Sequence, residues 1–140
     1  MEIKITTEID DHNAMAIKEI LSSYNVSHTT HLSACINESL EVTLVEEGEV
    51  IGGILGRSLW GTLEIQNLAV KESHRGQGLG KKLMLAAEQV AVERNCKYIS
   101  LNTFSFQASY FYQSLGYEIF AEEKDYPLGY SKIYLRKVLV

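Results

Sequence analysis

The sequence predicts an α/β fold in which helices flank a mixed β-sheet on both faces. A strand pattern at residues 62–70 is followed by a long amphipathic helix pattern at 78–94 and a second strand at 97–103. A strand, helix, strand order of this kind joins parallel strands by a right-handed crossover. Strand pairs with short connections, at 41–57 and 117–138, add antiparallel neighbours on either side.

Length and composition suit a single domain spanning residues 1–140. The chain has 140 residues, 46% of them apolar, and only one proline, so it can bury one core and offers no obvious linker. We see neither a signal sequence nor an apolar run long enough for a membrane span, and we therefore expect a cytoplasmic location. A net charge of -5 argues against nucleic acid as a partner and mildly favours a cationic one, such as an amine.

The cysteines and histidines do not form a metal-binding pattern. Cys35 and Cys96 lie far apart without a CxxC partner, and we expect them to behave as small buried hydrophobes. Only His28 and His31 have a spacing that a metal could use, but no acidic residue lies between or just after them. The sequence therefore predicts no metal.

The first 25 residues predict a strand and then a helix. Ile3 and Ile5 alternate with polar neighbours, which indicates an edge strand over residues 2–8. Asp10 or Asp11 can cap a following helix that runs to Tyr24-Asn25. Further on, the apolar spacing of Leu32, Cys35 and Ile36 hints at a short second helix within residues 26–40.

The next strands are separated by turn sequences. Residues 41–47 and 50–57 flank Gly48-Glu49, a hairpin signal, and Trp60-Gly61 turns the chain into the strand at 62–70.

That strand contains an irregularity. Leu63 and Ile65 keep a period of two, but the next apolar pair is Leu68 and Val70, so the phase slips by one residue. A β-bulge near Asn67 would absorb the slip, bend the strand away from its neighbour and leave backbone groups unpaired. Such a gap suits an extended ligand.

The remaining elements complete the sheet. Apolar residues at helical spacing predict the long helix at 78–94, and a short helix at 107–115 ends at Gly116. Residues 117–124 and 131–138 form the last antiparallel pair.

Residues 75–80, Arg-Gly-Gln-Gly-Leu-Gly, predict an anion-binding loop between strand and helix. Gly76, Gly78 and Gly80 allow positive φ angles and close approach of a ligand to the backbone, and the N-H groups of the following helix add donors. The spacing fits neither the G-x-G-x-x-G dinucleotide fingerprint nor a Walker loop, which needs a glycine where Arg75 stands.

The spacing R-x-x-G-x-G, read as Arg75, Gly78 and Gly80 after Leu68-Ala69-Val70, resembles the GNAT superfamily of acetyl-CoA-dependent N-acetyltransferases. The resemblance covers about residues 41–138. It implies a GNAT-type acyl-CoA N-acyltransferase fold, with a sheet splayed between two parallel strands, and acetyl-CoA as cosubstrate. It implies the following cofactor-binding residues: Leu68, Ala69, Val70, Arg75, Gly76, Gln77, Gly78, Leu79, Gly80, Lys81, Ser105 and Gln107.

Two residues are candidates for catalysis. Glu64 points to the face opposite Leu63 and Ile65 and could take a proton from the amine, although an alternating strand must also show polar residues to solvent. Tyr112 opens the segment Tyr112-Gln113-Ser114-Leu115-Gly116-Tyr117, which resembles the family's YxxxG[FY] segment. In the family that tyrosine is the usual acid for the CoA sulfur, but a tyrosine at helical spacing can also simply pack.

A narrower likeness, carried by residues 101–108 and 125–129 among others, is to a group of small bacterial GNAT proteins whose substrates are mostly unassigned. That group typically has aspartate where this chain has Asn102 and histidine where it has Tyr130. The leading hypothesis is direct attack of a small-molecule or peptide amine on acetyl-CoA. The alternative is a CoA-binding sensor or interaction module, and a homodimer remains open.

Overall fold

The computed structural model describes residues 1–139, which form two compact units, one over Met1–Ala34 and the other beginning at Cys35. The smaller unit contains helix α1 (Asp11–His28) and a 3-10 turn, η1 (Thr30–Leu32). Asp10 begins the helix as predicted, because its carboxylate accepts a 2.8 Å hydrogen bond from the Asn13 N-H.

Two predictions for this unit are wrong. Residues 2–8 form no strand, since no ladder of the described sheet includes them. Two alternating isoleucines fit a strand pattern, but a strand persists only where its backbone groups pair with a neighbour. The second helix is reduced to the η1 turn, and Cys35 and Ile36 lie beyond it.

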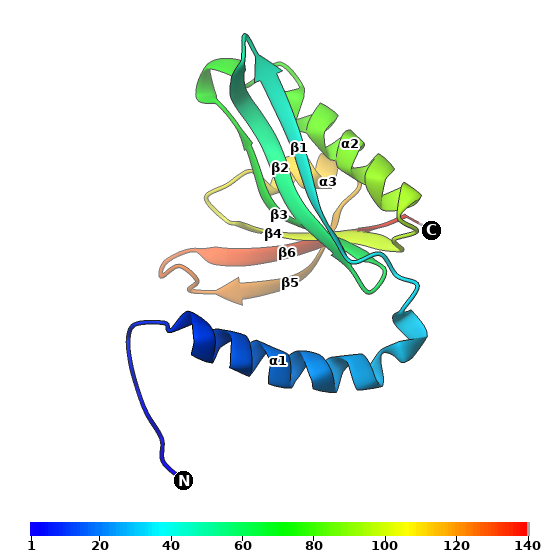
Figure 1. The fold of residues 1–140 in the computed structure, drawn as a ribbon. Coiled ribbons are helices and arrows are strands. Elements are labelled where there is room, and N and C mark those ends of the chain that lie inside the picture. Colours follow the sequence, from blue (N-terminus) through cyan, green and yellow to red (C-terminus); the bar gives the residue numbers. More distant parts are fainter. Residues whose placement is uncertain (140) are drawn as a thin grey trace. The chain divides into compact units, whose positions relative to one another are not determined.

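The larger unit is built on a six-stranded sheet of order β1-β2-β3-β4-β6-β5 (Figure 1). The strands are β1 (Glu38–Glu46), β2 (Glu49–Leu59), β3 (Thr62–Val70), β4 (Tyr98–Phe104), β5 (Glu118–Lys124) and β6 (Ser131–Val138). Only β3 and β4 run parallel, and all other neighbours are antiparallel. The predicted mixed α/β sheet is confirmed.

Both predicted turns between the first three strands are present. Glu47 and Gly48 have φ angles of 50° and 79°, and Trp60 and Gly61 have φ angles of 50° and 82°. Positive φ at both central residues is the type I′ pattern that matches the twist of two-residue hairpins. The first turn lies one residue earlier than the sequence predicts.

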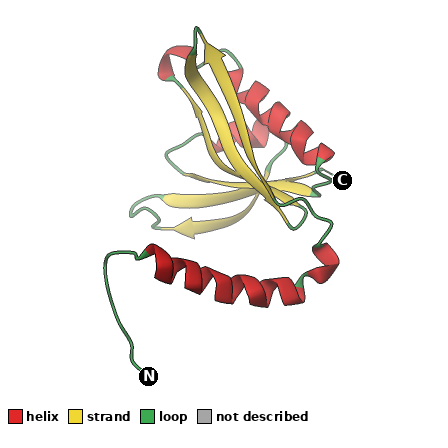
Figure 2. Ribbon diagram, in the orientation of Figure 1, coloured by secondary structure: helices red, strands yellow, loops and turns green. Residues whose placement is uncertain are grey.

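Helix α2 (Leu79–Glu93) packs against strands β1 to β4, and the short helix α3 (Ser109–Ser114) follows β4 (Figure 2). A 3-10 turn, η2 (Glu72–His74), leads into the glycine loop. Helix α2 buries Leu83, Met84, Ala87 and Ala91 on the sheet, within one core that also holds Leu63 and Ile99. This core fixes the helix N-terminus relative to the end of β3.

The predicted bulge is present and opens the sheet. Leu55 pairs with Asn67 and Gly56 with Ile65, so Gln66 is the extra residue on β3, one position before the predicted site. Strands β3 and β4 pair only from Thr62–Tyr98 to Ile65–Leu101. Past these residues no ladder joins the two strands, and their carboxyl ends diverge.

None of the helices in the described part of the chain is long and apolar enough to cross a membrane.

Candidate active site

A cleft of about 1050 Å³ lies where β3 and β4 diverge. Its walls come from the end of β3, the glycine loop with the first turn of α2, the end of β4 and helix α3. The lining residues are Gln66, Asn67, Leu68, Ala69, Val70, His74, Arg75, Gly76, Gly78, Leu79, Gly80, Lys81, Asn102, Thr103, Phe104, Phe106, Gln107, Ala108, Phe111 and Tyr112.

The glycine loop is open toward this cleft. Gly76 and Gly78 have φ angles of 79° and 75°, and a Cβ added at either would meet no atom within 4 Å. The positive φ angles therefore require glycine, while the space above the loop stays free for a ligand. No side chain caps α2, so the N-H groups of its first turn and its positive dipole end face this space. The loop has the chemistry of a phosphate site.

Arg75 holds the loop in place. Its Nε donates a 3.0 Å hydrogen bond to the Val70 carbonyl, which joins the start of the loop to the end of β3. The guanidinium also lines the cleft, where its charge favours an anionic ligand.

Gly80 brings helix α3 close to the first turn of α2. A Cβ at Gly80 would lie 3.2 Å from Cζ of Phe111. The glycine thus permits a close contact between two helices that both line the cleft.

Tyr112 presents a protonated phenol to the cleft. Its ring stands nearly perpendicular to those of Phe111 and Tyr117, at centroid distances of 5.0 and 6.1 Å. Burial raises the pKa of the Tyr112 hydroxyl above its ordinary value of 10.0. The group is therefore a proton donor throughout the neutral range.

Glu64 does not line the cleft. It is exposed on β3, where it faces Arg57 on β2 and Ser100 on β4. The first residue of β3 that lines the cleft is Gln66, two residues further along the strand.

Two other candidates also lie outside the lining. Gln77 is not part of the lining, and Ser105 pairs with the start of β6, accepting a 2.9 Å hydrogen bond from the Ser131 N-H. Gln107 does line the cleft, and its amide oxygen accepts hydrogen bonds from Thr103 Oγ1 and the Phe104 N-H, both at 2.9 Å.

Several lining residues were not among the sequence candidates: Gln66, Asn67, His74, Asn102, Thr103, Phe104, Phe106, Ala108 and Phe111. Most belong to the end of β4 and the loop that follows it. The predicted parallel pairing of β3 and β4 could have indicated these residues, because the carboxyl ends of parallel strands lie at the same edge of a sheet.

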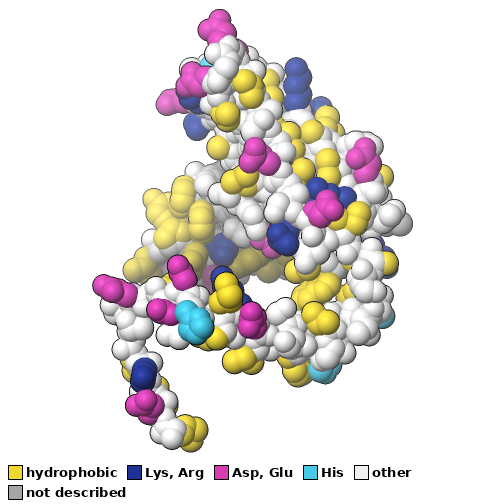
Figure 3. All heavy atoms as spheres, in the orientation of Figure 1, with side chains coloured by type: hydrophobic (Ala, Val, Ile, Leu, Met, Phe, Trp, Pro, Cys, Tyr) yellow, Lys and Arg dark blue, Asp and Glu magenta, His cyan; other side chains and the backbone are white. Residues whose placement is uncertain are grey.

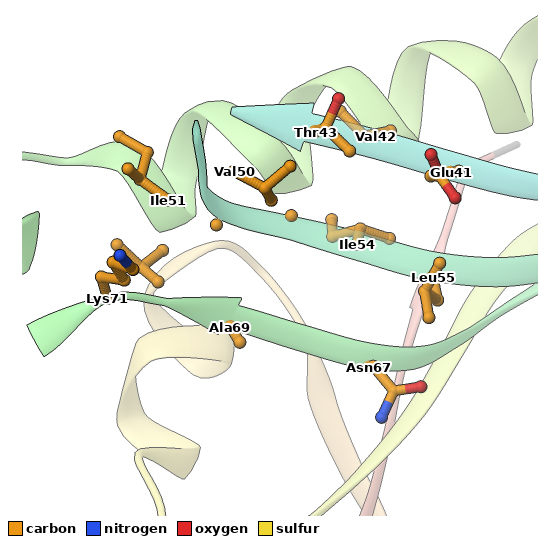
Figure 4. A pocket seen from close by; sticks show the side chains of 13 residues that line it. Glu41, Val42, Thr43, Val50, Ile51, Ile54, Leu55, Asn67, Ala69 and Lys71 are labelled. Carbon is orange, nitrogen blue, oxygen red and sulfur yellow. The ribbon is translucent and has the colours of Figure 1, made fainter. Parts of the chain in front are cut away.

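A second hollow of about 580 Å³ crosses β1, β2 and β3 (Figure 4). Gly53 and Ala69, which have little or no side chain, leave space in this hollow, and aliphatic side chains such as Val50 and Leu55 surround it. Glu41 and Lys71 are the charged residues among those that line it. No set of polar groups converges there, so the cleft between β3 and β4 is the candidate active site.

The described residues contain no group of three or more His, Cys, Asp or Glu side chains placed to hold a metal ion.

A split between two parallel strands, with an anion-binding loop at the start of the next helix, defines a class of proteins that bind an extended phosphate-bearing ligand. The profile of the acetyltransferase (GNAT) family matches residues 9–117. The chain therefore belongs to the GNAT family and is an acetyltransferase that uses acetyl-CoA.

Individual relatives agree with this assignment. The chain is 40% identical over 95 residues to the blasticidin-S acetyltransferase of Streptomyces morookaense, covering 67% of this chain and 70% of that protein. It is 29% identical over 118 residues to an acetyltransferase of Agrobacterium fabrum, with 84% of each chain covered. A crystal structure of an acetyltransferase from Bacillus cereus superposes with a TM-score of 0.88 at 32% identity, covering 97% of this chain and 98% of that one.

Proposed function

We propose that this protein transfers the acetyl group of acetyl-CoA to a primary amine by direct attack within a ternary complex. The continuity of the cleft supports this proposal, since one space runs from the glycine loop, past the open edge of β3, to the hydroxyl of Tyr112. A donor and an acceptor could thus meet without a covalent enzyme intermediate.

In this proposal the chain holds acetyl-CoA with backbone groups. The N-H groups of residues 76–81 bind the diphosphate, helped by the charges of Arg75 and Lys81. Leu68, Ala69 and Val70 offer the edge of β3 that β4 leaves unpaired to the amide groups of the pantetheine arm. Acetyl-CoA supplies an activated acyl group as its thioester.

The reaction then needs two proton transfers. The amine nitrogen forms a bond to the carbonyl carbon, the carbon-sulfur bond breaks, and the products are an amide and free CoA. Glu64 accepts the proton that the amine loses, and the Tyr112 hydroxyl donates a proton to the departing thiolate. In this proposal a water would carry the proton to Glu64, because the first residue of β3 that lines the cleft, Gln66, lies about 6–7 Å further along the strand.

The acceptor is a small-molecule amine in this proposal. The support comes from a relative that is called a blasticidin-S acetyltransferase. The test is a panel of amines, including blasticidin S, spermidine and a short peptide, supplied with acetyl-CoA while free thiol is measured. Initial rates should give intersecting double-reciprocal lines for the best acceptor. Parallel lines would replace direct attack with a covalent intermediate.

Tight CoA binding without amine-dependent thiol release would instead favour the CoA-binding module. The position of Glu64 outside the cleft lining is the observation that favours this second function.

A further inference from the structure

Four aromatic side chains form a cluster at the end of the cleft, which we call the aromatic shelf: Phe104, Phe106, Tyr126 and Tyr130. The Phe104 ring lies nearly parallel to the rings of Phe106 and Tyr126, with centroids 5.5 and 6.0 Å away. Tyr130 meets Phe106 edge-on at 5.1 Å. In Figure 3 hydrophobic side chains gather on the left of the view, where the β4–α3 loop and the β5–β6 turn lie.

The rings are unusually exposed. Phe106, Tyr126 and Tyr130 retain 57%, 51% and 50% of their accessible surface. A contiguous patch of exposed aromatic surface is a feature of binding sites in soluble proteins.

Hydrogen bonds hold the shelf in position. The Ser105 N-H donates to the Ser131 carbonyl at 2.8 Å, and the Ser131 N-H donates to Ser105 Oγ at 2.9 Å, so the loop after β4 is tied to the start of β6. Within the β5–β6 turn, the Tyr130 N-H donates to the Pro127 carbonyl at 2.8 Å. The two loops that carry the rings are thus held in place before any ligand arrives, which lowers the entropic cost of binding.

The shelf is continuous with the candidate active site. Phe104 and Phe106 line the cleft together with Tyr112. A molecule lying on the shelf can therefore extend its amine toward the thioester end of the cleft.

The charges around the shelf disfavour a polycation. None of the described residues that line the cleft is Asp or Glu. At the other end, the Lys132 ammonium lies 5.1 Å from the centre of the Tyr126 ring.

Two acidic residues of the β5–β6 hairpin lie close to the shelf in sequence but outside the cleft lining. Glu123 faces Lys132 across the β5–β6 ladder, and Asp125 accepts a 3.4 Å hydrogen bond from the Gly129 N-H. Glu64 is assigned to the reacting amine itself. A ligand with several ammonium groups would find no carboxylate along the described lining of the cleft that the shelf adjoins.

We infer that the aromatic shelf binds the acceptor, and that the acceptor is an amine that contains a flat, conjugated ring rather than an aliphatic polyamine. This inference rests on the proposed acetyl transfer and specifies the substrate class of the same site. Stacking on aromatic rings selects for planarity, because aromatic pairs gain free energy beyond that of the buried area alone.

A matched pair of acceptors tests the shelf. 2-Phenylethylamine and 2-cyclohexylethylamine are similar in size and charge but differ in planarity. With acetyl-CoA, kcat/KM should favour the phenyl compound by about two- to tenfold, as expected for one stacking contact. Phe106→Leu and Tyr130→Leu should each bring this ratio toward one, while Tyr110→Leu, an 84% exposed aromatic outside the shelf, should leave it unchanged.

The outcomes separate the inference from the function on which it rests. Equal rates for the two amines, or faster turnover of spermidine, would contradict the inference that the shelf binds the acceptor. Either result would leave the proposed acetyl transfer unaffected. If no amine supports thiol release, the proposed function fails, and saturation-transfer NMR of 2-phenylethylamine with the CoA-loaded protein then decides. Contact that Phe106→Leu removes would support the shelf, and contact that both shelf variants retain would overturn it.

Discussion

The hydroxyl of Tyr117 donates a 3.0 Å hydrogen bond to Oε1 of Glu88. The Lys137 ammonium donates to the same oxygen at 3.1 Å. These contacts join Tyr117, which follows α3 and precedes β5, to the middle of α2 and to β6. Because Tyr117 also packs edge-on against Tyr112, they fix the helix that carries the candidate catalytic acid.

Tyr117→Phe should therefore destabilise the fold. It removes a buried hydrogen bond to a charged acceptor, which typically contributes about 1.5–3 kcal/mol, and leaves Glu88 with Lys137 alone. The free energy of unfolding from urea titration should fall by that amount, with CoA affinity nearly unchanged. Tyr110→Phe, an exposed control, should leave the midpoint unmoved. A stable Tyr117→Phe protein would mean that the bond contributes little.

Gly78→Val should abolish CoA binding in a folded protein. A side chain there occupies the open space above the loop and disfavours the positive φ angle. Gly48→Val is a matched control, since Gly48 has a φ of 79° and no atom within 4 Å of an added Cβ, but lies in the β1–β2 turn. Calorimetry should show lost affinity only for Gly78→Val. If both variants bound CoA with equal affinity, residues 75–80 would be a connecting turn and not a binding loop.

Alkaline pH should destabilise the protein through Tyr112 and Tyr117. Burial raises the pKa of both hydroxyls above 10.0, and for Tyr117 the neighbouring Glu88 carboxylate adds to the effect. The native state then holds these protons more tightly than the unfolded chain, so their stabilisation is complete below the unfolded value of about 10 and is lost as the pH rises from there through the higher folded values.

Urea midpoints measured on both sides of that pH should fall further for the natural protein than for Tyr117→Phe. A parallel fall in both proteins would show that other groups, such as lysines, control the alkaline loss.

The sequence was informative where the chemistry is local. The turns at Gly48 and Gly61, the Asp10 cap and the glycine loop each depend on a few adjacent residues with strict backbone demands. The slip between Ile65 and Leu68 located the bulge to within one residue, because a change of phase in a strand must be absorbed there.

Predictions failed where the outcome depends on distant partners. Residues 2–8 alternate correctly, but pairing with another strand decides whether a strand forms. The aromatic shelf joins the loop after β4 to the β5–β6 turn through the hydrogen bonds between Ser105 and Ser131, which are 26 residues apart in sequence. No spacing rule relates those positions, so neither the shelf nor the structural use of Ser105 could be predicted.

Glu64→Gln should slow acetyl transfer while leaving acetyl-CoA affinity close to its natural value. Loss of a general base typically costs about 10²- to 10⁴-fold in rate, and the glutamate lies outside the cleft that would hold the cofactor. Glu122→Gln, an exposed glutamate on β5, is the control. An unchanged maximal rate and pH profile in Glu64→Gln would assign proton removal to solvent or to another group.

Tyr112→Phe should slow turnover while preserving the fold and most of the CoA affinity. Phenylalanine keeps the edge-on contacts with Phe111 and Tyr117 and removes only the hydroxyl, so a tyrosine that merely packs would lose little activity. A proton donor to the sulfur would lose much more. The loss should appear in the chemical step and shrink for acyl donors whose thiol leaves more easily, because these need less protonation in the transition state. Single-turnover rates with two such donors measure this difference directly. Equal rates for the natural protein and the variant would return Tyr112 to a packing role.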